Sequence, residues 1–175
     1  MISEQELLTQ AGQFDTRALA EIYDLYSPRL YRYAMRLLGD SSAAEDCVSE
    51  TFSRFLKALQ AGRGPRDYLQ AYLFRTAHNL IVDHYRRQTP TEELDDNLPQ
   101  LENTEESADL NLRQRHVRDA LHQLTEDQQQ VVAFKFLEGW ANEEIARALH
   151  KPVGAVKSLQ HRALAQLQKI LLDEV

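Results

Sequence analysis

The sequence predicts an all-α protein in which two small helical domains are joined by a flexible acidic linker. Only 6 glycines and 5 prolines occur among 175 residues, which is few for the many turns of an all-β fold. Apolar residues recur at steps of three and four along most of the chain, which is the spacing of one helix face. Acidic residues gather in one segment near the middle, and this segment separates the two helical parts.

The distribution of charge places the domain boundaries. The chain has a net charge of −7, and residues 89–117 contain two basic against eight acidic residues, a net charge of −6. This segment also contains Pro90 and Pro99 and has little helical periodicity, a composition typical of solvated linkers. We therefore expect a first domain at residues 1–88, a linker at 89–114 and a second domain at 115–175.

Two N-cap patterns open the first domain. Ser3 with Glu6 three residues later has the pattern of a capping box, and Asp15 is a second N-cap candidate. A long helix is expected to run from Asp15 to Gly39, with a kink or a break at Pro28. Its apolar stripe consists of Leu19, Ile22, Tyr23, Tyr26, Leu30, Tyr33, Ala34 and Leu37.

Two further helices complete the predicted first domain. One begins at Ser41 or Ser42, and the other follows a loop at residues 62–65 and ends at Arg86-Arg87. The residues expected to face inward are Val48, Phe52, Phe55, Leu56 and Leu59 in the first of these helices and Leu69, Leu73, Ala77 and Leu80 in the second.

The second domain is predicted to contain four shorter helices. The first passes through Val117, Leu121 and Leu124, and the second passes through Val131, Val132 and Phe136 and ends at Gly139. Thr125 is an N-cap candidate for the second of these helices, with Gln128 three residues later. Asn142 is the expected N-cap of a helix at residues 143–149, and residues 153–172 form the last helix.

The last two predicted helices have the layout of a helix-turn-helix motif. Ala146 is small where the two helices would cross, and Val156 would fill the junction between them. His150 stands at the turn position that favours glycine because its φ is positive, and histidine tolerates this region. A plain helical hairpin within a bundle is the alternative interpretation.

The outer face of the last helix carries candidate DNA-reading side chains: Lys157, Ser158, His161 and Arg162. An arginine can bind O6 and N7 of guanine through two hydrogen bonds, whereas lysine and serine bind phosphates or base edges. The alternative is a solvated helix face with no partner.

Three segments together resemble bacterial RNA polymerase sigma factors of the extracytoplasmic-function group. Residues 152–164 (PVGAVKSLQHRAL) resemble the promoter-reading helix of this family, and residues 44–52 (AEDCVSETF) resemble its core-polymerase-binding segment. Residues 72–87 (YLFRTAHNLIVDHYRR) resemble the helix that melts the promoter and reads the minus-ten element. The matches follow the order of the family and cover residues 14–88 and 115–172.

The resemblance implies an alternative sigma factor. Such a protein binds core RNA polymerase through its first domain, directs the polymerase to promoter DNA and helps melt the minus-ten element. Its second domain reads the minus-thirty-five element in the major groove, and the polymerase catalyses RNA synthesis. The resemblance further implies an anti-sigma factor as a partner.

The resemblance assigns polymerase binding to residues of the second long helix: Glu45, Asp46, Glu50, Phe52 and Arg54. Exposed carboxylates beside aromatic rings suit a mixed polar and apolar interface. The alternative is an ordinary amphipathic helix whose aromatic rings lie in the core, and we favour this alternative for Phe52 and Phe55.

The resemblance assigns minus-ten recognition to the helix that follows: Tyr72, Arg75, His78, Asn79, Asp83, Arg86 and Arg87. Asn79 can hydrogen-bond a flipped base because its amide both donates and accepts. Tyr72, Phe74 or His78 would stack on unpaired bases, and the arginines would hold phosphates. Tyr72 stands where the family usually has tryptophan.

No enzymatic activity, cofactor or metal site is predicted. The chain has no glycine-rich phosphate loop, nucleophile elbow or HExxH motif, and its six histidines show no i,i+4 pairing. Cys47 is the only cysteine, which excludes an intramolecular disulfide and agrees with a reducing cytoplasm. No apolar stretch is long enough to span a bilayer, so membrane insertion is not expected, and the N-terminus lacks the pattern of a signal peptide.

Two other classes of function stay open on the residues alone. A free-standing helix-turn-helix regulator would bind its site without polymerase, and a helical adaptor would bind proteins only. The negative net charge argues against strong DNA binding by the isolated chain, because nonspecific affinity comes from basic residues. It does not argue against a polymerase subunit, and the acidic linker could occupy a polymerase channel meant for nucleic acid.

Overall fold

The computed structural model describes residues 2–88 and 105–173, and within these ranges all regular structure is helical. The predicted all-α fold class is therefore confirmed. Most of the predicted linker, residues 89–104, lies outside the described residues.

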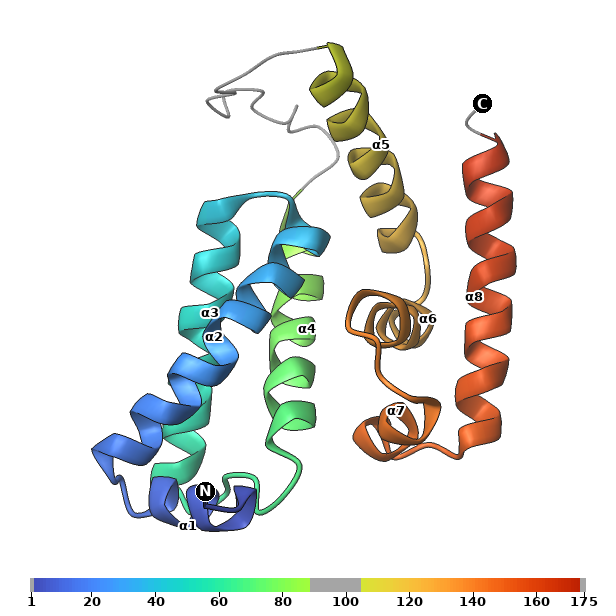
Figure 1. The fold of residues 1–175 in the computed structure, drawn as a ribbon. Helices are drawn as coiled ribbons and strands as arrows, with labels where there is room; N and C mark the ends of the chain where they lie inside the picture. Colours follow the sequence, from blue (N-terminus) through green and yellow to red (C-terminus); the bar gives the residue numbers. More distant parts are fainter. Residues whose placement is uncertain (1, 89–104, 174–175) are drawn as a thin grey trace.

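The first domain consists of four helices: α1 (Glu4–Gly12), α2 (Thr16–Leu38), α3 (Ser41–Gln60) and α4 (Leu69–Arg87). The three long helices pack on one another, and α1 lies across one end of this bundle (Figure 1). Its core includes Ile22, Leu30, Phe55, Leu69 and Leu73, all of which are fully buried.

The predicted caps of α1 and α2 are confirmed. The Ser3 hydroxyl accepts a hydrogen bond from the Glu6 amide at 3.2 Å, and the Glu6 carboxylate accepts one from the Ser3 amide at 3.2 Å. The Asp15 carboxylate caps α2 by accepting from the Arg17 amide at 2.9 Å. Gly39 ends α2 in the left-handed conformation with a φ of 71°.

Three local predictions in the first domain had different outcomes. Helix α2 continues through Pro28 without a break, and the Pro28 side chain is exposed, so solvent can reach the carbonyl that loses its amide partner. Helix α3 begins at Ser41, one of the two predicted positions, and Asp40 caps it by accepting from the Ser42 amide at 3.0 Å. Leu56 was expected in the core but is 39% exposed on the outer side of α3.

The second domain contains α5 (Glu105–His122), α6 (Glu126–Val132), the π-helical turn η1 (Ala133–Leu137), α7 (Asn142–Leu149) and α8 (Val153–Asp173). Helix α8 packs on α5, α6 and α7. The expected Thr125–Gln128 capping box is present, and Gly139 follows η1 with a φ of 72°.

Helix α5 begins earlier than the predicted helix, so residues 105–114 of the predicted linker are helical. Glu105 and Glu106 lie in its first turn, where carboxylates complement the helix dipole. Its first half exposes Leu110 and Leu112, which explains why the sequence has so little helical periodicity here.

One smaller prediction in the second domain also needs correction. Asn142 is the first residue of α7 and not its N-cap, and its Oδ1 accepts a hydrogen bond from Gln160 Nε2 at 2.7 Å. Val117 and Phe136, which the predicted helices pass through, are 46% and 56% exposed.

The two domains pack against each other through α2 and α4 of the first domain. The Arg36 guanidinium donates to the Leu137 carbonyl oxygen at 2.6 Å, and His122 Nε2 donates to the Leu37 carbonyl oxygen at 2.7 Å. The His122 ring also stacks on the Tyr85 ring, with centroids 3.6 Å apart. The structure thus describes a closed arrangement of the domains (Figure 1).

Gly39 lies at the interface between the two domains. We expect Gly39→Ala to lower the free energy of unfolding by about 1–2 kcal/mol. The substitution forces a Cβ into the left-handed region and against the Arg118 guanidinium. Gly12→Ala is the matched control, because a Cβ at Gly12 would meet nothing within 4 Å and its φ is not positive. Urea unfolding followed by circular dichroism tests both variants, and equal stabilities would contradict the prediction.

Candidate nucleic-acid interface

The helix-turn-helix of the second domain is built as the sequence predicts. Ala146 and Val156 are buried where α7 and α8 meet, and His150 adopts the left-handed conformation with a φ of 55°. Glu143 and Glu144 lie in the first turn of α7, at the opposite end of this helix from the turn that leads into α8. The motif therefore presents the N-terminal half of α8 to solvent.

The four candidate minus-thirty-five residues are all exposed on α8: Lys157, Ser158, His161 and Arg162. Their spacing places them on one face of the helix. The Arg162 Nε atom donates only to the Ser158 carbonyl oxygen, at 3.5 Å, so little holds its guanidinium away from a ligand. This face has the geometry and the chemistry for major-groove readout.

The candidate minus-ten residues of α4 fall into two groups. Asn79, Asp83, Arg86 and Arg87 are exposed, whereas Tyr72 and Arg75 are partly buried. Arg86 forms an ion pair with Glu126 of the second domain. In the closed arrangement, the guanidinium of Arg86, a candidate phosphate-binding residue, is therefore already paired with a carboxylate.

His78 and Phe74 are buried, with exposed fractions of 1% and 0%. His78 Nδ1 and the Tyr33 hydroxyl are joined by a hydrogen bond of 2.8 Å. Burial, with a smaller contribution from the nearby His122, lowers the pKa of His78 to about 3. The expectation that either ring stacks on a base therefore does not hold in this arrangement, because the second domain covers both.

The candidate polymerase-binding residues of α3 divide between surface and core. Glu45, Asp46, Glu50 and Arg54 are exposed, and Glu50 pairs with Arg54 at 3.3 Å. Phe52 is 9% exposed, so most of its ring packs inside, and Phe55 is fully buried as favoured from the sequence.

Beside these carboxylates lies an apolar surface that the sequence did not reveal. Tyr23 was placed in the apolar stripe of α2, yet its side chain is 50% exposed and its ring lies 4.9 Å from the Phe52 ring. Phe14 and Leu56 line the same shallow groove between α2 and α3. Carboxylates beside exposed rings suit a protein interface.

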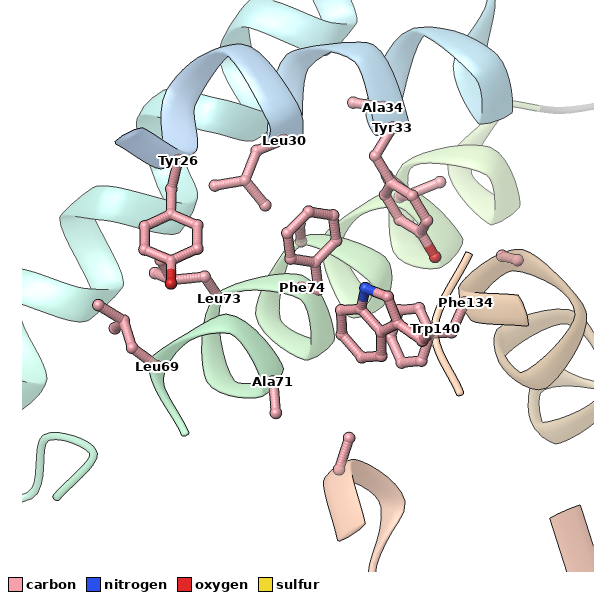
Figure 2. Close-up of a cluster of buried hydrophobic side chains, with 14 of the residues drawn as sticks. Tyr26, Leu30, Tyr33, Ala34, Leu69, Ala71, Leu73, Phe74, Phe134 and Trp140 are labelled. Carbon is pink, nitrogen blue, oxygen red and sulfur yellow. The ribbon is translucent and has the colours of Figure 1, made fainter. Parts of the chain in front are cut away.

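Sequence reasoning also missed a row of arginines on α2, where Arg29, Arg32 and Arg36 lie at steps of three and four and Arg36 donates to the Leu137 carbonyl oxygen of the second domain. All three influence Glu138, whose pKa is raised by burial and lowered by these arginines. Phe134 and Trp140 pack nearby on Tyr33 and Phe74 (Figure 2). The helical spacing of the arginines can be seen in the sequence, but the sequence does not indicate that Glu138 lies near enough to feel their charge.

Two absences apply to the described residues. Across residues 2–88 and 105–173, no group of three or more His, Cys, Asp or Glu side chains is arranged to hold a metal ion. In the same part of the chain, no helix is both long enough and apolar enough to cross a membrane.

The fold and these exposed faces define a two-domain helical protein with a helix-turn-helix DNA-binding domain. Family comparison then identifies both domains: residues 22–91 match Sigma-70 region 2, and residues 114–167 match Sigma-70, region 4. Together the two models match more than half of the chain. The chain belongs to the extracytoplasmic-function group of the sigma-70 family of RNA polymerase sigma factors.

Relatives of this group align along most of the chain. The ECF RNA polymerase sigma factor BldN of Streptomyces coelicolor is 36% identical over 172 residues, and the match covers 94% of this chain and 64% of that protein. The chain thus spans less than two thirds of this relative. The ECF RNA polymerase sigma factor SigL of Mycobacterium tuberculosis is 29% identical over 166 residues, which cover 93% of this chain and 94% of SigL.

Two solved structures share the fold. CnrH in complex with the cytosolic domain of CnrY has a TM-score of 0.72 and 23% identity, covering 98% of this chain and 99% of that chain. The sigma factor RpoE of Bartonella quintana, solved with the anti-sigma factor NepR, has a TM-score of 0.59 and 23% identity, covering 87% of this chain and 95% of that chain.

Proposed function

We propose that this chain acts as an alternative sigma factor that binds core RNA polymerase, directs it to specific promoters and helps melt the minus-ten DNA. The observation that carries the proposal is the exposed helix-turn-helix face of α8 in one domain, joined to the exposed polar faces of α3 and α4 in the other. The chain works in the cytoplasm and needs no cofactor. It is not an enzyme, because the polymerase performs the chemistry.

Polymerase binding is assigned to the outer face of α3. Glu45, Asp46 and Glu50 supply exposed carboxylates, and Arg54 adds a cation within reach of Glu50. Phe52 contributes only the edge that remains accessible, together with the neighbouring Tyr23 ring. A polar face flanked by an apolar groove suits a docking helix with both kinds of side chain.

Minus-ten recognition is assigned to the exposed side of α4. Asn79 offers a donor and an acceptor to a base edge, and Arg87 is exposed for a phosphate. Asp83 lies one turn after Asn79 and would accept from exocyclic amines. Arg86 joins this surface once its ion pair with Glu126 is released, and the partly buried Tyr72 and Arg75 lie on the same helix.

Minus-thirty-five recognition gives a direct test of the α8 face. In holoenzyme, Arg162→Ala is expected to cost about 1–3 kcal/mol of promoter binding if Arg162 binds a guanine, and to relax specificity at that base pair. Lys157→Ala is expected to weaken binding to all sequences and to reduce the salt slope by about one. Ser158 and His161 would make secondary contacts.

Lys169→Ala is the matched control, since Lys169 is exposed on α8 but lies two turns beyond Arg162. Fluorescence anisotropy with promoter duplexes at several salt concentrations measures both the affinity and the slope. An Arg162→Ala holoenzyme that binds like the Lys169→Ala holoenzyme would exclude this face from DNA.

We further propose an anti-sigma factor as a partner. The RpoE relative was solved with such a protein, and the exposed apolar side chains of α5 and α8 offer this chain a protein-binding surface. Affinity capture of the tagged chain from its native cell would identify polymerase subunits and the inhibitor. Recovery of polymerase without any inhibitor would overturn this part of the proposal.

A further inference from the structure

Helices α7 and α8 of the helix-turn-helix contact each other at two adjacent levels. Ala146 and Val156 form the level nearer the turn, and both are buried. Asn142 lies one turn before Ala146 on the same face of α7, and Gln160 lies one turn after Val156 on α8. The second level is polar, since Gln160 Nε2 donates a hydrogen bond to Asn142 Oδ1 at 2.7 Å.

This hydrogen bond does not cap a helix. Ala141 is the N-cap of α7 and offers no side-chain acceptor, while Asn142 follows it as the first helical residue. Asparagine is among the preferred N-cap residues, yet the Asn142 Oδ1 atom accepts from the other helix. Asn142 and Gln160 are both half-buried, in contrast to the exposed face of α8 that carries the candidate DNA-reading residues. The bond therefore ties α7 to α8.

A hydrogen bond constrains this junction in a way that apolar packing does not. The burial of apolar surface is non-directional, so the contact of Ala146 with Val156 tolerates small rotations of one helix on the other. An amide hydrogen bond weakens steeply as its distance and angle depart from the optimum. Two levels of contact, one of them directional, thus fix the angle between α7 and α8. Because α8 also packs on α5 and α6, loss of the bond is expected to change this angle and to leave the domain folded.

The angle between these helices decides where the reading side chains meet the DNA. In a helix-turn-helix the first helix crosses the DNA backbone while the second lies in the major groove, and contacts to the backbone set the register and orientation of the protein. Gln160 directly precedes His161 and Arg162 on α8. The Arg162 guanidinium is held by its own helix only through a bond of 3.5 Å to the Ser158 carbonyl oxygen, so the position of α8 sets its aim.

We propose that Asn142 and Gln160 are positioning residues for minus-thirty-five recognition, and that their hydrogen bond holds α8 at the angle from which its exposed face reads base edges. The inference rests on the proposed sigma-factor function and adds to it two residues that act through their neighbours. The Gln160 amide is bound to α7, so it serves the reading face without belonging to it. Loss of the bond should therefore weaken discrimination among sequences more than it weakens attraction to the phosphate backbone.

Holoenzyme binding to a pool of promoter duplexes, randomised at the minus-thirty-five element, tests this role. Sequencing of the bound and free fractions gives the relative affinity for each base at each position. Asn142→Ala and Gln160→Ala are each expected to reduce the preference for the favoured bases about fivefold to tenfold, spread over several adjacent base pairs. Because this preference is a ratio of affinities within one sample, a partly unfolded preparation does not alter it.

Three further variants separate positioning from other roles. Asn142→Asp keeps an oxygen that accepts from Gln160, so it is expected to retain the natural base preference. The double variant Asn142→Ala/Gln160→Ala should lose no more than either single variant, because each single variant already breaks the bond. Gln168→Ala is the matched control, since Gln168 is exposed on α8 about two turns beyond Gln160.

The outcomes distinguish this inference from the proposed function. If the natural holoenzyme prefers no bases in the pool, the assignment of α8 to minus-thirty-five recognition fails, and this inference fails with it. If the natural holoenzyme has a preference and both single alanine variants keep it, the positioning role alone is overturned. Weaker binding of Asn142→Asp to every sequence would also overturn it, because a carboxylate repels a phosphate that the natural side chain contacts directly. Additive losses in the double variant would show that the two side chains act independently and would overturn the pairing.

Discussion

Replacing Phe134 by alanine is expected to lower the free energy of unfolding by about 3–5 kcal/mol. The Phe134 side chain is fully buried and joins the two domains, since its ring packs on Tyr33, His78 and Trp140. Truncation removes this buried apolar area and leaves a cavity. Tyr33 and His78, which line the cavity, are held on the long helices α2 and α4, so they cannot move in to fill it. The closed arrangement should open before the helices melt.

Phe136→Ala is the matched control, because it deletes the same side chain two residues later at a position that is 56% exposed. We expect it to change the free energy of unfolding by no more than about 0.5 kcal/mol. Urea titration followed by circular dichroism gives the stabilities, and Trp140 emission reports the interface. Losses of similar size in the two variants would contradict the buried position of Phe134.

Acid is expected to destabilise the protein through His78. Its pKa is lowered by burial from 6.5 to about 3, so between these values the unfolded chain binds a proton that the folded chain does not. The free energy of unfolding therefore falls as the pH drops through this window, by about 2–3 kcal/mol between pH 6.5 and 4.5. Burial lowers the pKa of His122 as well, which adds loss of the same sign.

His78→Gln isolates this contribution. The glutamine oxygen can still accept from the Tyr33 hydroxyl, but the side chain no longer titrates. Stability measured by urea unfolding at several pH values should fall less steeply for the variant than for the natural chain. Parallel curves would show that His78 is not the group responsible.

The helices themselves were predictable because their signals are local. Asp15 and Gly39 bracket α2, Thr125 caps α6, and the left-handed His150 marks the turn between α7 and α8. Each depends on residues only a few positions away, which a single sequence contains. The first half of α5 escaped prediction because its side chains are mostly exposed and so form no apolar stripe.

The state of the candidate site could not be predicted in the same way. Asn79 and Arg162 are exposed as their roles require, whereas His78 lies in an interface formed with Phe134, far along the chain. Periodicity identifies a buried face of α4 but not which domain covers it. The pairing of Arg86 with Glu126 and the hydrogen bond from Arg36 to the Leu137 carbonyl oxygen depend on the same closure.

Run-off transcription tests the central claim most directly. Core RNA polymerase from the native cell is mixed with this chain and a library of genomic fragments, and the transcript starts are mapped. We expect specific starts only when polymerase and chain are both present, and their loss with the Arg162→Ala variant but not with Lys169→Ala. The absence of specific starts from every fragment, with sequence-specific binding by the chain alone at physiological salt, would instead indicate a free-standing regulator.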